Sequence, residues 1–113
     1  MKKLALVMAA AALAGCTAPD ASGVKVIVGA KLIAAPGREP IEYSVVVIEG
    51  GKITAAGPQS AIPVPKGSAI TRGIGMTVEP EPGGDPIEAG RAANLVLKGA
   101  SERKMRNGEW VQP

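Results

Sequence analysis

The stretch IEYSVVVIE at residues 41–49 is the clearest strand pattern in the chain. Its centre, VVVI at residues 45–48, is apolar on both faces of an extended strand. We therefore expect this strand to be central and covered on both sides. Gly50-Gly51 and then KITAA at residues 52–56 follow it. Two residues that tolerate positive φ between two strand patterns predict a two-residue hairpin.

Further strand patterns lie on both sides of this hairpin: VKVIV at residues 24–28, SAIT at 68–71, MTV at 76–78 and AANLVLK at 92–98. Gly29-Ala30 predicts a bulge, with KLIA at residues 31–34 continuing the first strand. Asn107-Gly108 predicts the turn of a terminal hairpin over residues 104–111. Gly73-x-Gly75 predicts a turn, and residues 79–86 show neither strand nor helix signal. Only residues 1–13 and 99–106 are compatible with helix, so we expect an all-β domain.

The N-terminus has the pattern of a bacterial lipoprotein signal peptide over residues 1–15. Lys2-Lys3 forms a positive n-region, and the apolar run that follows, about ten residues, is too short to span a bilayer. Leu13-Ala14-Gly15-Cys16 resembles a lipobox, which predicts lipid attachment to the Cys16 thiol. The alternative is an ordinary signal peptide with an incidental cysteine. Residues 16–23 are small and polar and predict a flexible tether.

Lipid on Cys16, with two acyl chains and an amide-linked third, would anchor the protein firmly to a membrane, whereas a single chain gives only marginal binding. Thr17, and not an aspartate, follows the cysteine. By resemblance to enterobacterial sorting, this favours the periplasmic face of the outer membrane. Cys16 is the one cysteine of the chain, so an intramolecular disulfide is excluded.

Charge gives no indication of a nucleic-acid partner. Without Lys2 and Lys3 the 13 basic residues fall to 11, against 10 acidic residues. Binding to nucleic acid requires Lys and Arg clustered on one face. The densest basic stretch, Arg103-Lys104-x-Arg106, is interpreted as a solvated strand or turn edge.

The residues also limit the chemistry. The chain has no His, so a Ser-His or Cys-His dyad is excluded and a hydrolytic zinc site is disfavoured. Trp110 is interpreted as an edge or core anchor, with stacking on a sugar or base as the alternative. An acidic stretch could hold a hard cation such as Ca²⁺ weakly, but we favour a solvated linker. Its residues are Glu79, Glu81, Asp85 and Glu88. We therefore predict no catalytic, metal-binding or cofactor-binding residues.

The order of the motifs resembles the composite β-sandwich domain of the amidohydrolase superfamily, as in imidazolonepropionase-like and dihydroorotase-like members. The N-terminal part of that domain is similar to IVGAKLI at residues 27–33, VVIEGGKITAAGP at 46–58 and MTVEP at 76–80. The part that follows the family's barrel is similar to GDPIEAGRAANLVL at residues 84–97 and RNGEWV at 106–111. The resemblance implies a small β-sandwich over residues 24–113, formed from N-terminal and C-terminal segments. The signal peptide that precedes it is expected, from its own residues, to be helical.

The departures from the family pattern concern its active site. Members continue from the Val-x-Pro motif into a metal-binding TIM barrel, which needs about 200 residues or more. Here Val78-Glu79-Pro80 leads almost directly to the post-barrel segment, so the barrel is missing at about residues 79–86. The family's His-x-His pair, bridging Lys and catalytic Asp have no counterparts. Its usual Ala-Asp-Leu-Val is Ala93-Asn94-Leu95-Val96.

Three interpretations follow from the missing barrel. The first is a lipid-anchored periplasmic sandwich without activity of its own, either a binding or structural module or a remnant related to amidohydrolases. The second is a component of a metal-dependent amidohydrolase, acting on non-peptide C–N bonds and completed by a separate barrel chain. The third is an artefact that joins two ends of a full-length enzyme. A sandwich without its barrel would expose an apolar patch, so we also predict a homodimer or a barrel partner protein.

Overall fold

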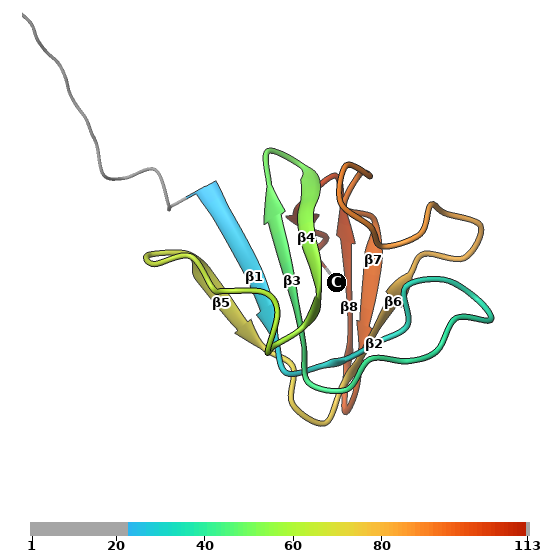
Figure 1. Cartoon of the computed structure of the whole chain (residues 1–113). Helices are drawn as coiled ribbons and strands as arrows, with labels where there is room; N and C mark the ends of the chain where they lie inside the picture. Colours follow the sequence, from blue (N-terminus) through green and yellow to red (C-terminus); the bar gives the residue numbers. More distant parts are fainter. Residues whose placement is uncertain (1–22, 113) are drawn as a thin grey trace, which may run out of the picture.

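The computed structural model describes residues 23–112 (Figure 1). This part of the chain is all-β and folds into two sheets. The signal peptide expected at residues 1–15 and most of the tether expected at residues 16–23 lie outside the described residues. The strands are β1 (Val24–Val28), β2 (Lys31–Leu32), β3 (Ser44–Glu49), β4 (Lys52–Pro58), β5 (Ala69–Arg72), β6 (Thr77–Pro80), β7 (Leu95–Lys98), β8 (Glu102–Arg106) and β9 (Glu109–Trp110).

The first sheet has the order β4-β3-β1-β5. β3 pairs antiparallel with both β4 and β1, and β5 adds to β1 in parallel. The prediction that the 45–48 run is central and covered on both sides is confirmed, because no residue from Val45 to Ile48 is more than 5% exposed.

The second sheet has the order β2-β6-β7-β8-β9. β2 and β6 are parallel, whereas β6, β7, β8 and β9 follow one another as antiparallel neighbours. This sheet joins an N-terminal strand, β2, to the C-terminal strands. The expected small sandwich built from N-terminal and C-terminal segments is therefore confirmed.

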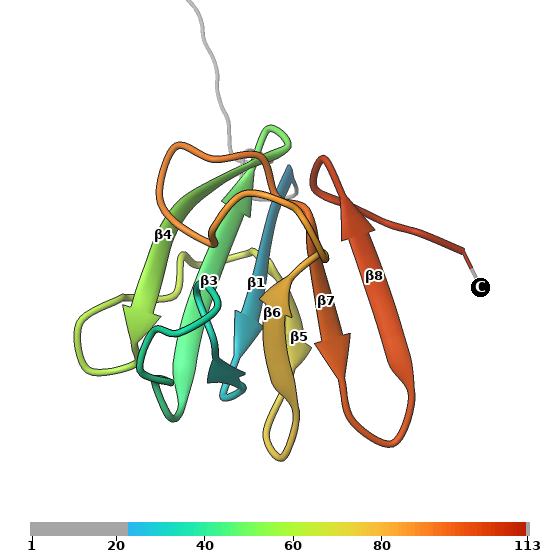
Figure 2. The same cartoon turned by 90° about the vertical axis from the view of Figure 1, so that its right-hand side faces the viewer.

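The main core lies between the two sheets, which face each other in Figure 2. Because the chain has no Phe, this core is aliphatic, with Ile27, Val46, Ile48 and Ile53 from the first sheet and Leu32, Val78, Leu95, Leu97 and Met105 from the second. A smaller valine cluster covers the outer face of the first sheet, and the β4–β5 connection places Ile62 against it. Both faces of the first sheet are thus apolar.

The prediction of a bulge at Gly29-Ala30 within one continuous strand is wrong. Gly29 has a φ of +93°, and there the chain leaves the first sheet and crosses to the second. Lys31 and Leu32 then pair with Thr77 and Val78 of β6. Simple alternation of apolar residues is the same whether a strand continues in one sheet or passes to another, so the sequence pattern missed the crossing.

Both predicted glycine hairpins are present. Gly50 and Gly51 have φ values of +60° and +80°, and Asn107 and Gly108 have values of +49° and +81°. Positive φ at both central residues is the geometry that matches the twist of paired strands. The two turns touch each other, because a Cβ added to Gly108 would lie 2.7 Å from the Gly51 Cα. This contact closes the sandwich at its upper end in Figure 1.

Several predicted boundaries need correction. The strand expected from residue 41 begins at Ser44, because Tyr43 adopts a φ of +47°. The strand expected from residue 92 begins at Leu95, since residues 92 and 93 bond to the first sheet instead. Residues 79–86 are not entirely loop: Glu79 and Pro80 end β6, where the missing N–H of a proline is tolerated. Helix is not formed at residues 102–106, which are strand β8.

Candidate functional site

The predicted lipid site lies outside the described residues. Cys16 and its lipobox residues Leu13, Ala14 and Gly15 all precede Gly23, where the described chain begins. Their role therefore stays a prediction from the sequence. Among residues 23–112, no helix is long and apolar enough to cross a bilayer.

The junction where the barrel is expected to be missing forms a complete β-turn at residues 81–84. Pro82 occupies its second position, and Gly83 occupies its third with a φ of +77°. The Gly84 N–H donates to the Glu81 carbonyl at 2.8 Å. Proline followed by a positive-φ glycine is the sequence signature of a type II turn. The chain thus reverses here with all turn positions occupied by suitable residues.

The segment after this turn is bound tightly to the sandwich. Ile87 is 2% exposed and belongs to the main core, and its N–H donates to the Ala34 carbonyl at 2.8 Å. Gly90 donates to the Ile53 carbonyl at 2.7 Å, and Ile53 donates to the Arg91 carbonyl at 2.8 Å. The segment between β6 and β7 therefore connects the two sheets and contributes to the core.

The carboxylates of the acidic stretch point to different cations. The pairs are Glu79 with Lys98 at 3.4 Å, Glu81 with Arg106 at 3.1 Å, and Glu88 with Arg38 at 2.6 Å and Arg91 at 3.7 Å, while Asp85 is exposed. Arg106 binds Glu81 through two parallel hydrogen bonds, a geometry that adds directional specificity to the charge attraction. Across residues 23–112, no group of three or more His, Cys, Asp or Glu side chains is placed to hold a metal ion.

These pairs also set the charge states of two carboxyls. The hydrogen bond from Arg106, with its positive charge, lowers the pKa of Glu81 from its ordinary value of 4.5. The same contact raises the pKa of Arg106. The hydrogen bond from Arg38, with the charges of Arg38 and Arg91, lowers the pKa of Glu88. A general acid needs a raised pKa near the working pH, so neither of these two carboxyls is suited to that role.

The basic stretch of β8 does not present its charges together. Arg103 lies over the Trp110 ring, 4.1 Å from its centroid, whereas Arg106 binds Glu81. Trp110 is partly buried and packs against the main core, as the interpretation of an edge anchor requires. A hollow of about 550 Å³ lies beside this pair, lined by residues 101–104 and 110–112.

Asn94 lies at the position where the amidohydrolase pattern that this sequence resembles has an aspartate. Its side-chain Oδ1 accepts a hydrogen bond from the Asn107 N–H at 2.7 Å. The neighbouring Ala93 carbonyl accepts from the Gly108 N–H at 3.1 Å. Asn94 therefore orders the β8–β9 turn, a structural role for which an amide oxygen is sufficient.

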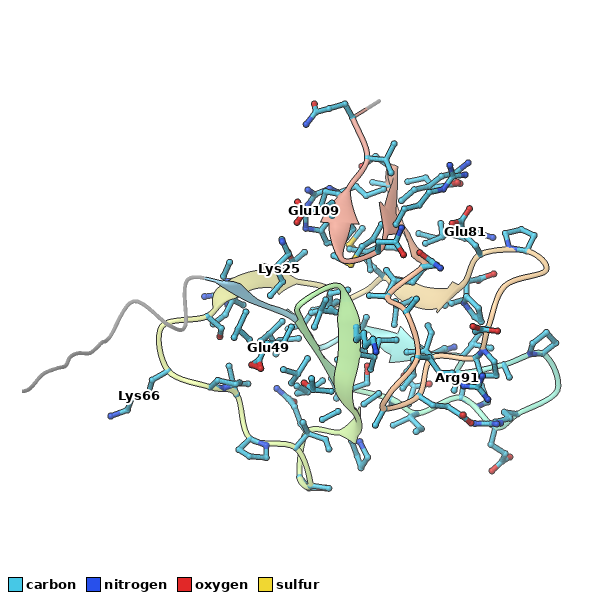
Figure 3. The ribbon with its side chains drawn as sticks, turned by 90° about the horizontal axis from the view of Figure 1, so that it is seen from above. Lys25, Glu49, Lys66, Glu81, Arg91 and Glu109 are labelled. Atoms are coloured by element: carbon cyan, nitrogen blue, oxygen red, sulfur yellow. The ribbon has the colours of Figure 1, made fainter. Side chains whose placement is uncertain are left out.

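Two further hollows lie at opposite ends of the sandwich. One of about 650 Å³ lies by the two touching hairpins and is lined by residues that include Lys25, Lys52 and Glu109. Lys25 and Glu109 reach toward each other across the sheets (Figure 3), with 3.5 Å between Nζ and Oε2. The other, of about 340 Å³, lies beside Tyr43 and Ile74. The described residues thus define a small all-β sandwich with open surface hollows.

Comparison with known proteins gives a partial similarity to a solved structure. No protein-family model matches the sequence, and no curated protein matches it. The solved structure of molinate hydrolase is similar to this chain with 30% sequence identity and a TM-score of 0.47. The match covers 52% of this chain and 13% of the molinate hydrolase chain. This protein therefore matches only a small part of the length of that hydrolase.

Proposed function

We propose that this chain is a lipid-anchored, periplasmic β-sandwich module without catalytic activity of its own, related to the composite domain of amidohydrolases. The observation that carries the proposal is the closed junction between β6 and β7. A type II turn at residues 81–84 and the buried Ile87 lie in the segment where the resemblance to amidohydrolases implies a missing barrel. Function depends on a site and not on a fold. Of the four carboxylates near this junction, three are paired with Lys or Arg side chains.

The closed junction favours a module over the two other interpretations. A chain that depended on a separate barrel would leave apolar residues of the junction uncovered, whereas here Ile87 is inside the core. An accidental fusion of two ends would not be expected to place Pro82 and Gly83 at the two turn positions that favour proline and glycine. The expected partner is therefore a protein that binds a finished surface of the sandwich.

The lipid anchor is proposed from the lipobox and is tested by metabolic labelling. The full chain and its Cys16→Ser variant are expressed in a Gram-negative host with an alkyne-bearing palmitate analogue, and the membrane fractions are compared. Labelled wild-type protein in the outer-membrane fraction and unlabelled variant in soluble fractions are expected. Equal labelling or equal distribution of the two proteins would rule out attachment at Cys16.

The absence of activity is tested on the wild-type chain with a panel of cyclic amides and amidines, in the presence of Zn²⁺ or Mn²⁺. No hydrolysis above the rate with metal alone is expected. Metal-dependent turnover that follows the protein through successive purification columns would contradict the proposal, and would favour a completed amidohydrolase instead.

A further inference from the structure

The hollow of about 340 Å³ lies where three separate parts of the chain meet. Its lining comes from β2, from the residues that precede β3, and from the β5–β6 turn with the first residue of β6: Lys31, Glu42, Tyr43, Ile74, Gly75, Met76 and Thr77. The β5–β6 turn and the start of β3 both lie at the lower end of the sandwich, away from the β3–β4 hairpin (Figures 1 and 2). This end is distant from the junction and from the hairpin hollow.

The two most exposed large apolar side chains of residues 23–112 line this one hollow. Ile74 is 69% exposed and Tyr43 is 62% exposed. Single exposed apolar residues are common on protein surfaces, but apolar side chains gathered on a rimmed hollow indicate an interaction site. An exposed tyrosine is also well suited to an interface, because it is apolar at the ring and polar at the hydroxyl.

The backbone of Tyr43 supplies a second, independent observation. Its φ of +47° is one of two positive values among non-glycine residues in the described part of the chain. A bulky residue in this region costs about 1–3 kcal/mol, and such residues cluster at functional sites. The buried Ser44 holds the conformation, because its N–H and its hydroxyl both donate to the Ala30 carbonyl, at 2.9 and 2.7 Å. Glycine or asparagine would fill the position at lower cost, so the aromatic ring itself is the feature to explain.

The rim of the hollow carries one charge of each sign. Lys31 and Glu42 lie 3.7 Å apart, and their side chains are 45% and 64% exposed. Each surface therefore offers a cation, an anion and two apolar side chains. An interface with two-fold symmetry requires a patch that is complementary to itself. In such a pair, Lys31 faces Glu42 of the second copy. Tyr43 faces Ile74 of that copy. Because of the two-fold symmetry, each of these contacts occurs twice.

We propose that a second copy of this chain docks on this hollow, with Tyr43 and Ile74 as apolar anchors and Lys31 and Glu42 as reciprocal ion pairs. The proposal rests on the proposed role as a protein-binding module and names its partner and surface. The seven lining residues are few beside the roughly 20–30 residues per side of a standard stable interface. The dimer is accordingly weak, and attachment of both copies to one membrane would raise their effective concentration.

Site-specific photo-crosslinking of the full chain in cells tests this proposal. The photoreactive residue p-benzoylphenylalanine replaces Tyr43, and in a control it replaces Lys66, which is exposed in the β4–β5 connection. Irradiation is expected to give a band of twice the chain mass for position 43 and none for position 66. Tryptic digestion of that band is expected to join the peptide of residues 39–52 to the peptide of residues 73–91, which contains Ile74.

Charge reversal makes the test specific to the proposed geometry. Lys31→Glu or Glu42→Lys alone places like charges opposite each other and is expected to reduce the dimer band about five-fold or more. Co-expression of the Lys31→Glu chain with the Glu42→Lys chain places two acidic side chains of one copy opposite two basic side chains of the other. It is expected to recover most of the band, although neither chain keeps its own Lys31–Glu42 ion pair. A dimer band that is unchanged in both single variants, or that co-expression does not recover, would overturn the proposal. An adduct of position 43 with a different protein would also overturn it, while leaving the role as a binding module intact.

Discussion

Gly29 is restricted to glycine by two separate constraints. Its φ of +93° is unfavourable for residues with a Cβ, and an added Cβ would lie 2.5 Å from the Ile74 Cγ1. We predict that Gly29→Ala lowers the free energy of unfolding by about 2–4 kcal/mol, measured by urea denaturation. Gly75→Ala is the matched control, because its φ is +83° but an added Cβ would meet nothing within 4 Å. Equal losses for the two variants would show that the contact with Ile74 does not contribute.

The Glu81–Arg106 pair makes stability depend on pH in acid. The folded pKa of Glu81 lies below its ordinary value of 4.5, so its stabilising effect is present above that value. It is lost as the pH falls through the lower, folded pKa. We predict that Arg106→Gln raises the pKa of Glu81 toward 4.5, followed by carboxyl NMR during an acid titration.

Arg38→Gln is the control for that titration, because Arg38 contacts Glu88 and not Glu81. It is expected to raise the pKa of Glu88 and leave the pKa of Glu81 unchanged. A Glu81 pKa that is insensitive to Arg106→Gln would mean that the two hydrogen bonds between these side chains do not persist in solution.

Single residues were predictable where backbone chemistry restricts the choice. Gly50-Gly51 and Asn107-Gly108 were predicted as turns because positive φ strongly favours glycine and asparagine, and all four residues have positive φ. The positive φ of Tyr43 was not predictable, since tyrosine has no preference for that region. The partners of the acidic stretch were also missed, because Arg38 and Arg106 are distant from it in sequence and only the fold brings them near.

At the scale of elements, the segment between β6 and β7 is an integral part of the core. Ile87 is 2% exposed, although it belongs to no strand. We predict that Ile87→Ala lowers the free energy of unfolding by about 2–4 kcal/mol, measured by urea denaturation. Ile74→Ala removes the same atoms from a side chain that is 69% exposed and is expected to change stability by less than about 0.5 kcal/mol. A small loss for Ile87→Ala would contradict the closed junction.

Strand existence was predictable, but the assignment of strands to sheets was not. β1, β3, β4 and the β8–β9 hairpin follow from apolar runs and turn residues that are local in sequence. The crossing at Gly29 depends on the pairing of Lys31 with Thr77, which are far apart in the chain. The attachment of residues 90–93 to the β3–β4 hairpin is likewise a long-range contact. The local periodicity of apolar residues cannot predict either contact.

At the scale of the whole molecule, a domain of this size has little surplus stability. About 90 residues bury only about two-thirds of their unfolded surface, and the absence of Phe leaves an aliphatic core. Backbone contacts hold both ends of the sandwich. The touching glycine hairpins lie at one end, the chain crosses between the sheets at Gly29 at the other, and a hydrogen-bonded turn at residues 81–84 follows β6.

The central claim is that the sandwich is a finished domain that needs no barrel. The most direct test is a two-dimensional amide NMR spectrum of residues 17–113 without lipid. We predict one set of well-dispersed peaks, with slow hydrogen exchange at the amides of Ile87 and Gly90, which donate to Ala34 and Ile53. Collapsed or broadened peaks, or fast exchange at both of these amides, would mean that the junction is open and that the domain requires another chain to fold.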